Sequence, residues 1–171
     1  EDGLKHLTNC ELAGRTGTIE SLGGALEISR GRALKLLSAL AARGLVSTDG
    51  VALSLTPDGH TYGMRMVRAH RLLERYFADR TGIAPAEWHE RAEREEHRIS
   101  KAEADHLAAS LGNPLMDPHG DPIPSVFGTL PPASGVSLAG VAPGTAATIV
   151  HLEDEPREAY DRLRAMGLNP A

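Results

Sequence analysis

Side chains that bind metals recur at helical spacing in two stretches of the chain. In one stretch, two histidines and two glutamates stand at i, i+4, i+7 and i+8: His89, Glu93, Glu96 and His97. On an α-helix these four positions fall within an arc of about 100°. A second pair, His70 and Glu74, repeats the i, i+4 spacing on what reads as another helix. Two helices that each present imidazole and carboxylate groups can bind a divalent cation, and this donor set suits Mn, Fe, Co, Ni or Zn.

An ordinary surface helix is the main alternative for residues 87–97, because Glu and Arg dominate this stretch. Two observations argue against it. His70 and Glu74 lie beside Leu72 and Leu73 rather than in a polar segment. The ligand-type side chains of 87–97 also share one face, whereas the arginines lie elsewhere.

Known metalloenzyme motifs do not fit the spacing. A zincin requires His four residues after His89, where the chain has Glu93. A di-iron bundle site requires Glu three residues before His97, where the chain has Arg94. The sequence shows no nucleophile paired with a base and no glycine loop for phosphate, so we expect that the protein is not an enzyme.

The composition is that of a globular protein with a mildly acidic charge. The chain has 171 residues, a hydrophobic fraction of 41% and a formal net charge of −5. This charge argues against a general nucleic-acid coat but leaves room for a small DNA-binding face. The single cysteine, Cys10, excludes an intrachain disulfide, and no apolar run approaches the roughly 20 residues of a membrane span. Without a recognisable signal peptide, a cytoplasmic protein with no membrane contact is expected.

The N-terminal part of the chain has the element order of a winged helix-turn-helix. A leucine-spaced first helix is followed by a helix capped by Thr18 and a third helix capped by Ser29. Asp49-Gly50 then marks a two-residue hairpin turn between β-capable runs. The turn motif itself is expected at 18–27 and 29–43.

The start of the third helix carries small, hydroxylic and basic residues, as a helix in the DNA major groove requires. Arg32 and Lys35 lie three residues apart and share one face. The candidate DNA-contacting residues are Ser29, Gly31, Arg32, Lys35 and Arg43. A basic helix on an ordinary helical subdomain is the alternative, but the Asp-Gly hairpin that follows favours DNA binding.

Further helices and a proline-rich linker are predicted for the rest of the chain. Thr56-Pro57 begins a long helix, Pro85 opens the next one, and Ser100 with Glu103 forms a capping box for another. Residues 113–135 contain six prolines and read as loop and linker. Two short strands are expected at 136–141 and 145–152, followed by a helix near 156–166.

In this order, these features resemble the diphtheria toxin repressor family of metal-dependent transcriptional regulators, which has iron-responsive and manganese-responsive members. The resemblance covers almost the whole chain, and its most specific segments are 69–75, 89–97 and 118–124. We interpret His119, in the last segment, as structural. The resemblance implies a mainly α fold with a winged helix-turn-helix at 1–64, a helical metal-binding and dimerisation domain at 65–125, and a linker with a partial SH3-like domain at 126–171. This last α+β segment is related to ferrous-transport accessory domains.

The family's two metal sites carry over onto particular residues. One resembles a site of His70, Glu74 and His89, with Glu155 and Glu158 placed to complete it. The other resembles a site of Asp2, Glu93, Glu96 and His97. Iron-type members have Met and Cys where this chain has Asp2 and Glu93, whereas manganese-type members have Asp and Glu. Hard oxygen ligands favour Mn(II), with Fe(II) as the alternative and other divalent metals possible in vitro.

The chain departs from the family pattern at three positions near its start. A further carboxylate of some manganese-type members falls at Lys5, and the usual aromatics near positions 3 and 8 are replaced by Gly3 and Thr8. Glycine lowers helix propensity by about 1 kcal/mol relative to alanine. The first helix is therefore expected to be loosely held without metal.

The resemblance implies a repressor that binds double-stranded operator DNA as a homodimer when loaded with Mn(II) or Fe(II), and that controls genes of metal-ion homeostasis. A cation bound by Asp2 and by ligands of 93–97 would tie the first helix to the second domain and so bias DNA binding. Apolar faces at 66–80 and 101–111 are expected to form the dimer interface. A metal-binding or sensing protein without DNA binding is the alternative, and a metallohydrolase is a weaker one.

Overall fold

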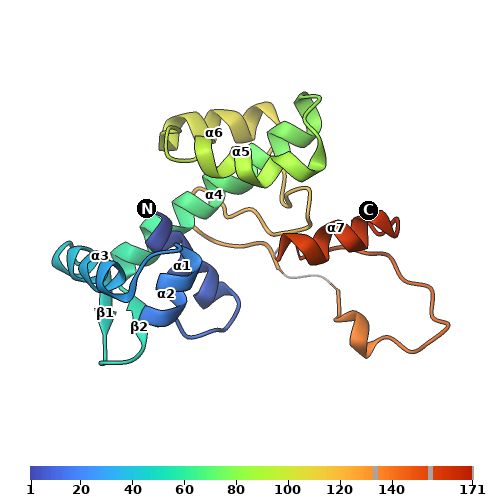
Figure 1. Ribbon diagram of the computed structural model, residues 1–171. Helices are drawn as coiled ribbons and strands as arrows, with labels where there is room; N and C mark the ends of the chain where they lie inside the picture. Colours follow the sequence, from blue (N-terminus) through green and yellow to red (C-terminus); the bar gives the residue numbers. More distant parts are fainter. Residues whose placement is uncertain (133–134, 154–155, 171) are drawn as a thin grey trace. The chain divides into compact units, whose positions relative to one another are not determined.

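Most ordered elements of the chain are α-helices, which confirms the mainly α fold (Figure 1). The computed structural model describes residues 1–132, 135–153 and 156–170, and the chain divides into two units, Glu1–Arg68 and Ala69–Ala171. The first unit has 8 Lys and Arg against 7 Asp and Glu, whereas the second has 10 against 16, so the acidic excess belongs to the second unit. No helix in the described part of the chain is long and apolar enough to cross a membrane.

The first unit is a helix-turn-helix followed by a two-stranded hairpin, as predicted. Its elements are α1 (Asp2–Leu12), α2 (Ile19–Ala25), α3 (Arg30–Ala42), β1 (Val46–Thr48), β2 (Leu53–Leu55) and the first part of α4 (Pro57–Arg80). Thr18 caps α2 as predicted, because its Oγ1 accepts the Ser21 N–H and Ser21 Oγ accepts the Thr18 N–H. Ser29 stands at the N-cap of α3 but makes no capping hydrogen bond. Leucines of α1, α2 and α3 form the core together with Val46 and Leu53 of the hairpin.

The hairpin loop is longer than the predicted two-residue turn. The strand register leaves residues 49–52 as a four-residue loop. Asp49 Oδ1 accepts the N–H groups of Ala52 at 2.9 Å and Val51 at 3.2 Å, and these bonds hold the pKa of Asp49 below its usual value. The two-residue prediction was wrong because this side chain reverses the backbone over a wider loop, an Asx-type turn.

Small residues let α1 pack closely against its neighbours. Gly3 is buried, and a Cβ atom there would lie 3.0 Å from Leu36 Cδ2. An aromatic side chain would not fit this packing, which accounts for the glycine. Thr8 is also fully buried, and its Oγ1 donates to the Leu4 carbonyl at 2.8 Å on the side that faces Gly63 of α4.

Overpacking is the expected effect of a larger residue at position 63. A Cβ atom on Gly63 would lie 1.9 Å from Thr8 Oγ1. We expect Gly63→Ala to lower the free energy of unfolding by about 1–3 kcal/mol, measured by urea denaturation. Thr8→Ala in the same chain removes the clashing oxygen and should restore part of the loss, so strictly additive losses would contradict this contact. Gly24→Ala is the control, since an added Cβ there meets no atom within 4 Å.

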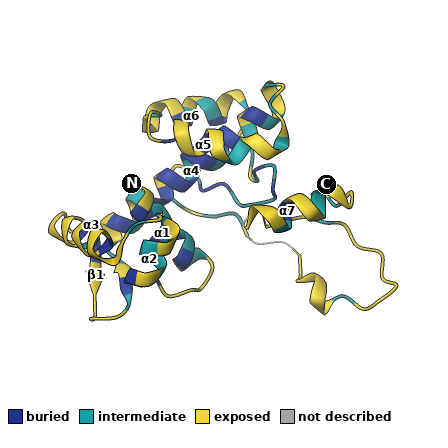
Figure 2. Ribbon diagram, viewed as in Figure 1, coloured by how far each residue is buried: buried dark blue, intermediate teal, exposed yellow. Residues whose placement is uncertain are grey.

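The second unit is built from the rest of α4 and from shorter helices. These are η1 (Pro85–Glu87), α5 (Trp88–Glu95), α6 (Lys101–Ser110), η2 (Leu138–Gly140) and α7 (Arg157–Ala165). The predicted capping box is present, since Ser100 Oγ accepts the Glu103 N–H and a Glu103 carboxylate oxygen accepts the Ser100 N–H. Buried residues of α4, Leu72 and Leu73 among them, pack against α5 and α6 (Figure 2). These contacts determine which side of α4 faces α5 and α6.

The C-terminal segment lacks the predicted strands. Within described residues 135–153 the chain forms no strand, and the short helix η2 lies where the first strand was expected. A strand needs a neighbouring strand to satisfy its backbone groups, and Pro143-Gly144 interrupts the segment. The predicted helix near 156–166 is confirmed as α7. The SH3-like character of the segment and the division at 64 and 125 remain predictions.

Candidate metal centre and DNA-reading helix

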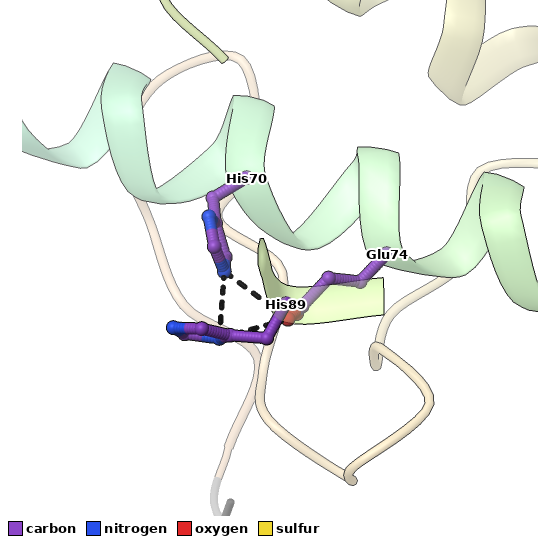
Figure 3. Close-up of side chains that lie close together, drawn as sticks. All are labelled: His70, Glu74 and His89. Carbon is purple, nitrogen blue, oxygen red and sulfur yellow. Dashed lines mark hydrogen bonds and ion pairs between the residues drawn. The ribbon is translucent and has the colours of Figure 1, made fainter. Parts of the chain in front are cut away.

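Three of the predicted ligands lie together in the second unit (Figure 3). His70 and Glu74 stand one turn apart on α4, and His70 Nε2 lies 3.1 Å from Glu74 Oε1. His89 of α5 places its Nδ1 3.3 Å from His70 Nε2 and 3.2 Å from Glu74 Oε1. Donor atoms bound at about 2.0–2.2 Å and at right angles to each other stand about 3 Å apart. The triangle therefore has the size that a divalent cation requires.

Glu74 is held in the charged form that a metal ligand needs. It is 2% exposed, and burial by itself opposes ionisation. The His70, His89 and His119 side chains outweigh burial and hold the pKa of Glu74 well below its usual range. The carboxylate is therefore ready to bind a cation without first losing a proton.

Glu96 contacts His70, a residue of the other predicted site. The helix α5 ends at Glu95, one residue before Glu96, so the four ligand-type residues do not all lie within one helix. Glu96 is buried, and its Oε2 lies 2.5 Å from His70 Nδ1. A proton on Nδ1 leaves Nε2 of the same ring free to face Glu74 and His89. A carboxylate in this position orients a metal-binding histidine and strengthens it as a ligand.

The other residues of the second predicted site are partly assembled. Glu93 is exposed on α5, with its Oε1 3.6 Å from His89 Nε2. His97 Nε2 lies 3.9 Å from Glu96 Oε1. Asp2 is exposed at the start of α1, in the first unit. Its assignment to the same site as the other three residues remains a prediction.

The candidate DNA-contacting residues are all exposed. They are Ser29, Gly31, Arg32, Lys35 and Arg43. Ala33 and Leu40 of α3 are buried in the core. Arg32 and Lys35 lie on the exposed side of the helix, where they do not contribute to the core. Gly31 has open space where a Cβ would stand, which permits a backbone to approach closely. This surface can meet the major groove of DNA.

Known proteins resemble the chain in both sequence and structure. The family profile described as "Iron dependent repressor, metal binding and dimerisation domain" matches residues 56–125. "Iron-dependent repressor IdeR" of Mycobacterium leprae is 29% identical over 98% of this chain and 78% of its own length. The solved structure "Manganese-dependent transcriptional repressor complex with manganese" superposes with a TM-score of 0.85 and 28% identity, covering 98% of this chain and 79% of that one. In both sequence and fold, the chain is similar to the diphtheria toxin repressor family.

Members of the diphtheria toxin repressor family that match this chain are repressors rather than enzymes. "Diphtheria toxin repressor" of Corynebacterium diphtheriae is 35% identical over 44% of this chain and 33% of its own length. The matched profile is itself named for metal binding and dimerisation. Together with the triangle of His70, Glu74 and His89, this assigns a metal cofactor to the chain.

Of the two C-terminal ligands that the family resemblance implied, only Glu158 can be placed. Glu155 lies outside the described residues. Glu158 is exposed on α7, and the ligand groups that converge in the described part of the chain do not include it. Its role as a ligand remains a prediction.

Asp117, a buried carboxyl near the triangle, was not singled out from the sequence. Its Oδ1 accepts the N–H groups of His119 at 2.8 Å and Asp121 at 2.9 Å. Burial, followed by the negative charges of Glu74 and Asp121, raises the pKa of Asp117 to about 9. The Asp-Pro-His-Gly-Asp sequence could have predicted this role, because Asp side chains in such turns often accept hydrogen bonds from the backbone.

Stability of the metal-free protein should therefore fall as the pH rises from about 4 to about 9. In that window folded Asp117 keeps its proton while the unfolded chain, with a pKa near 3.8, does not. Asp117→Asn mimics the neutral acid and should remove a slope of up to about 1.4 kcal/mol per pH unit, measured by urea unfolding. A variant that is equally destabilised at every pH would contradict the raised pKa. Asp79→Asn, at a half-exposed ion pair with Arg75, is the control.

Proposed function

We propose that this chain is a metal-dependent repressor that binds operator DNA as a homodimer and controls genes of metal-ion homeostasis. The observation that carries the proposal is the ligand triangle of His70, Glu74 and His89. It lies in a chain that also exposes Arg32 and Lys35 on a helix-turn-helix. A protein that only buffers metal would have no use for that exposed basic helix.

Mn(II) is the metal that we propose, with Fe(II) as the alternative. The family resemblance assigns Asp2 and Glu93 to the second site, and both supply hard oxygen atoms rather than sulfur. A solved structure with 28% identity over nearly the whole chain is that of a manganese-dependent repressor. The IdeR relative is named for iron, so the ligand chemistry rather than the names supports Mn(II).

The decisive experiment compares DNA binding with and without metal. A DNA fragment is first selected from a random pool with the full chain and Mn(II), and its affinity is then measured by fluorescence anisotropy with Mn(II), Fe(II), Zn(II) or chelator. We expect tight binding with Mn(II) that chelator abolishes. Metal binding without selection of any DNA sequence would instead favour a sensor or buffer. Equal affinity with Mn(II) and chelator would contradict metal dependence.

Arg32 is expected to read bases of the operator. Arg32→Ala should weaken binding to the selected fragment by about 1–3 kcal/mol and relax its specificity, measured by anisotropy with intact and mutated fragments. Arg157→Ala removes an exposed arginine from α7 in the second unit and should leave the affinity unchanged. An Arg32 variant that loses affinity equally for all sequences would show a backbone contact instead.

An open apolar groove in the second unit is the proposed dimer interface. It has a volume of about 640 Å³ and lies along α4, the end of α5 and α6. Its apolar lining includes Leu73, Tyr76, Ile99, Ala102 and Leu107. Arg98 lines it together with the acidic Glu95 and Glu103, so two copies related by a two-fold axis could pair opposite charges. These are the helices on which the sequence predicted apolar faces.

A further inference from the structure

Leu34 is a leucine of the DNA-reading helix α3 that does not belong to the core. The other leucines of this helix pack in or against the core of the first unit: Leu36, Leu37 and Leu40. Leu34 is not among the described residues that form or cover this core, and it is 44% exposed. A large part of its apolar surface therefore faces water.

Leu34 lies on the same side of α3 as two of the candidate DNA-contacting residues. At 100° per residue, Gly31 is about 60° from Leu34 around the helix and about 40° from Lys35. All three residues are exposed, and Figure 2 shows the outer side of α3 as exposed surface. A helix that brings Lys35 to DNA therefore brings Leu34 to the same groove.

The neighbours of Leu34 along α3 leave its side chain uncovered. Side chains on a helix lean toward its N-terminus, so Leu34 extends over the turn that contains Gly31. A Cβ atom at Gly31 would meet no atom within 4 Å. One turn later, Ser38 is small, and its Oγ donates to the Leu34 carbonyl at 2.9 Å. The leucine thus forms an apolar surface between two small residues, which a base edge can approach closely.

The chemistry of the major groove limits what such a leucine can contact. The base edges there carry hydrogen-bond donors and acceptors, and their one apolar group is the 5-methyl of thymine. A leucine against the polar edges would remove their water without replacing the lost hydrogen bonds. Against a thymine methyl, both apolar groups leave water, which is favourable. Exposed leucines are common elsewhere on protein surfaces, whereas the expected neighbour of this one is a base edge.

We propose that Leu34 reads a thymine in each half-site of the operator through contact with its 5-methyl group. This inference rests on the proposed function, because α3 must enter the major groove for the contact to form. It adds an apolar specificity residue to the small and basic residues that are the candidate DNA contacts. Removing one methyl group from such a contact should weaken binding about three- to tenfold.

The test removes the methyl group from the DNA and the leucine from the protein. The DNA fragment selected with the full chain and Mn(II) is remade with deoxyuridine in place of one thymine at a time, which deletes only the 5-methyl group. Fluorescence anisotropy with Mn(II) measures the affinity. We expect at least one thymine in each half-site at which the exchange weakens binding of the parent protein about three- to tenfold. Leu34→Ala should lose a similar factor in each half-site of the unmodified fragment and should not respond to that exchange.

Two further variants make the result specific to an apolar side chain at position 34. Leu34→Met keeps an apolar side chain that favours helices and should retain the response to deoxyuridine. Leu138→Ala makes the same truncation at a leucine of the second unit that is 78% exposed, and it should bind every fragment like the parent. Because Leu34 is exposed and alanine favours helices, the melting temperature of Leu34→Ala should equal that of the parent.

The possible outcomes separate this inference from the proposed function. Loss of a methyl group can also change the shape and stiffness of DNA, but that effect would be the same for the parent and for Leu34→Ala. An equal response of both proteins to every exchange would therefore overturn the role of Leu34 and leave the repressor function intact. Equal weakening of Leu34→Ala on all DNA sequences would show a contact with the sugar–phosphate backbone instead, and would also overturn the proposal. A parent protein that selects no DNA sequence would overturn the proposed function and this inference with it.

Discussion

Glu74→Gln should weaken metal binding by at least about 100-fold, because this carboxylate is the one anionic corner of the triangle with His70 and His89. Changes in the outer shell of metal sites cost about 10–100-fold in affinity, and loss of a charged ligand should exceed that. Glutamine retains the shape of the side chain and one acceptor oxygen. We expect the fold to persist, while the rise in melting temperature on adding Mn(II) and the metal-dependent gain in DNA affinity both largely disappear.

Calorimetric titration with Mn(II) measures this loss, and Glu90→Gln is the matched control. Glu90 undergoes the same chemical change on α5, but it is exposed and bonded to Arg94 at 2.6 Å. Its variant should bind Mn(II) like the parent chain. If Glu74→Gln kept both the parent's affinity and its stabilisation by metal, the triangle would not be the metal centre.

Local signals were enough to predict most of the helices and part of the metal centre. Thr18 and Ser100 cap helices through hydrogen bonds to residues three positions away. The start of each helix can therefore be predicted from a few neighbouring residues. His70 and Glu74 belong to one helix, whose geometry alone brings i and i+4 together. His89 joins them from α5, and its grouping with them came from the resemblance to the family.

Contacts set by tertiary packing could not be predicted in the same way. Glu96 meets His70 because α5 ends at Glu95, and the path of the chain beyond a helix depends on what it packs against. The burial of His119 beside Glu74 also depends on how its loop packs. The strands expected at 136–141 and 145–152 have β-capable residues, but a strand forms only where a partner strand exists.

Tyr76→Glu should shift the protein from dimer to monomer, weakening the dimer by at least about 100-fold. Tyr76 is 37% exposed and lines the groove between α4 and α6, so it can be replaced without opening a cavity in the core. A two-fold axis places the same charge in the interface twice. An uncompensated charge buried there costs about 3–5 kcal/mol, and Glu95 and Glu103 on the same groove would add repulsion.

Sedimentation velocity over a range of concentrations measures the dimer, and three variants make the result specific to the groove. Tyr76→Phe keeps the ring and should remain dimeric. Ala102→Glu adds a charge to the same groove from the first turn of α6, where Glu favours the helix, and should also give monomers. Ala109→Glu makes the same change on α6 outside the groove and should remain dimeric.

The two monomeric variants should also lose most of their affinity for a two-fold symmetric operator even with Mn(II) bound, because each monomer can bind only one half-site. Dimers in both variants would place the interface on another face of the second unit.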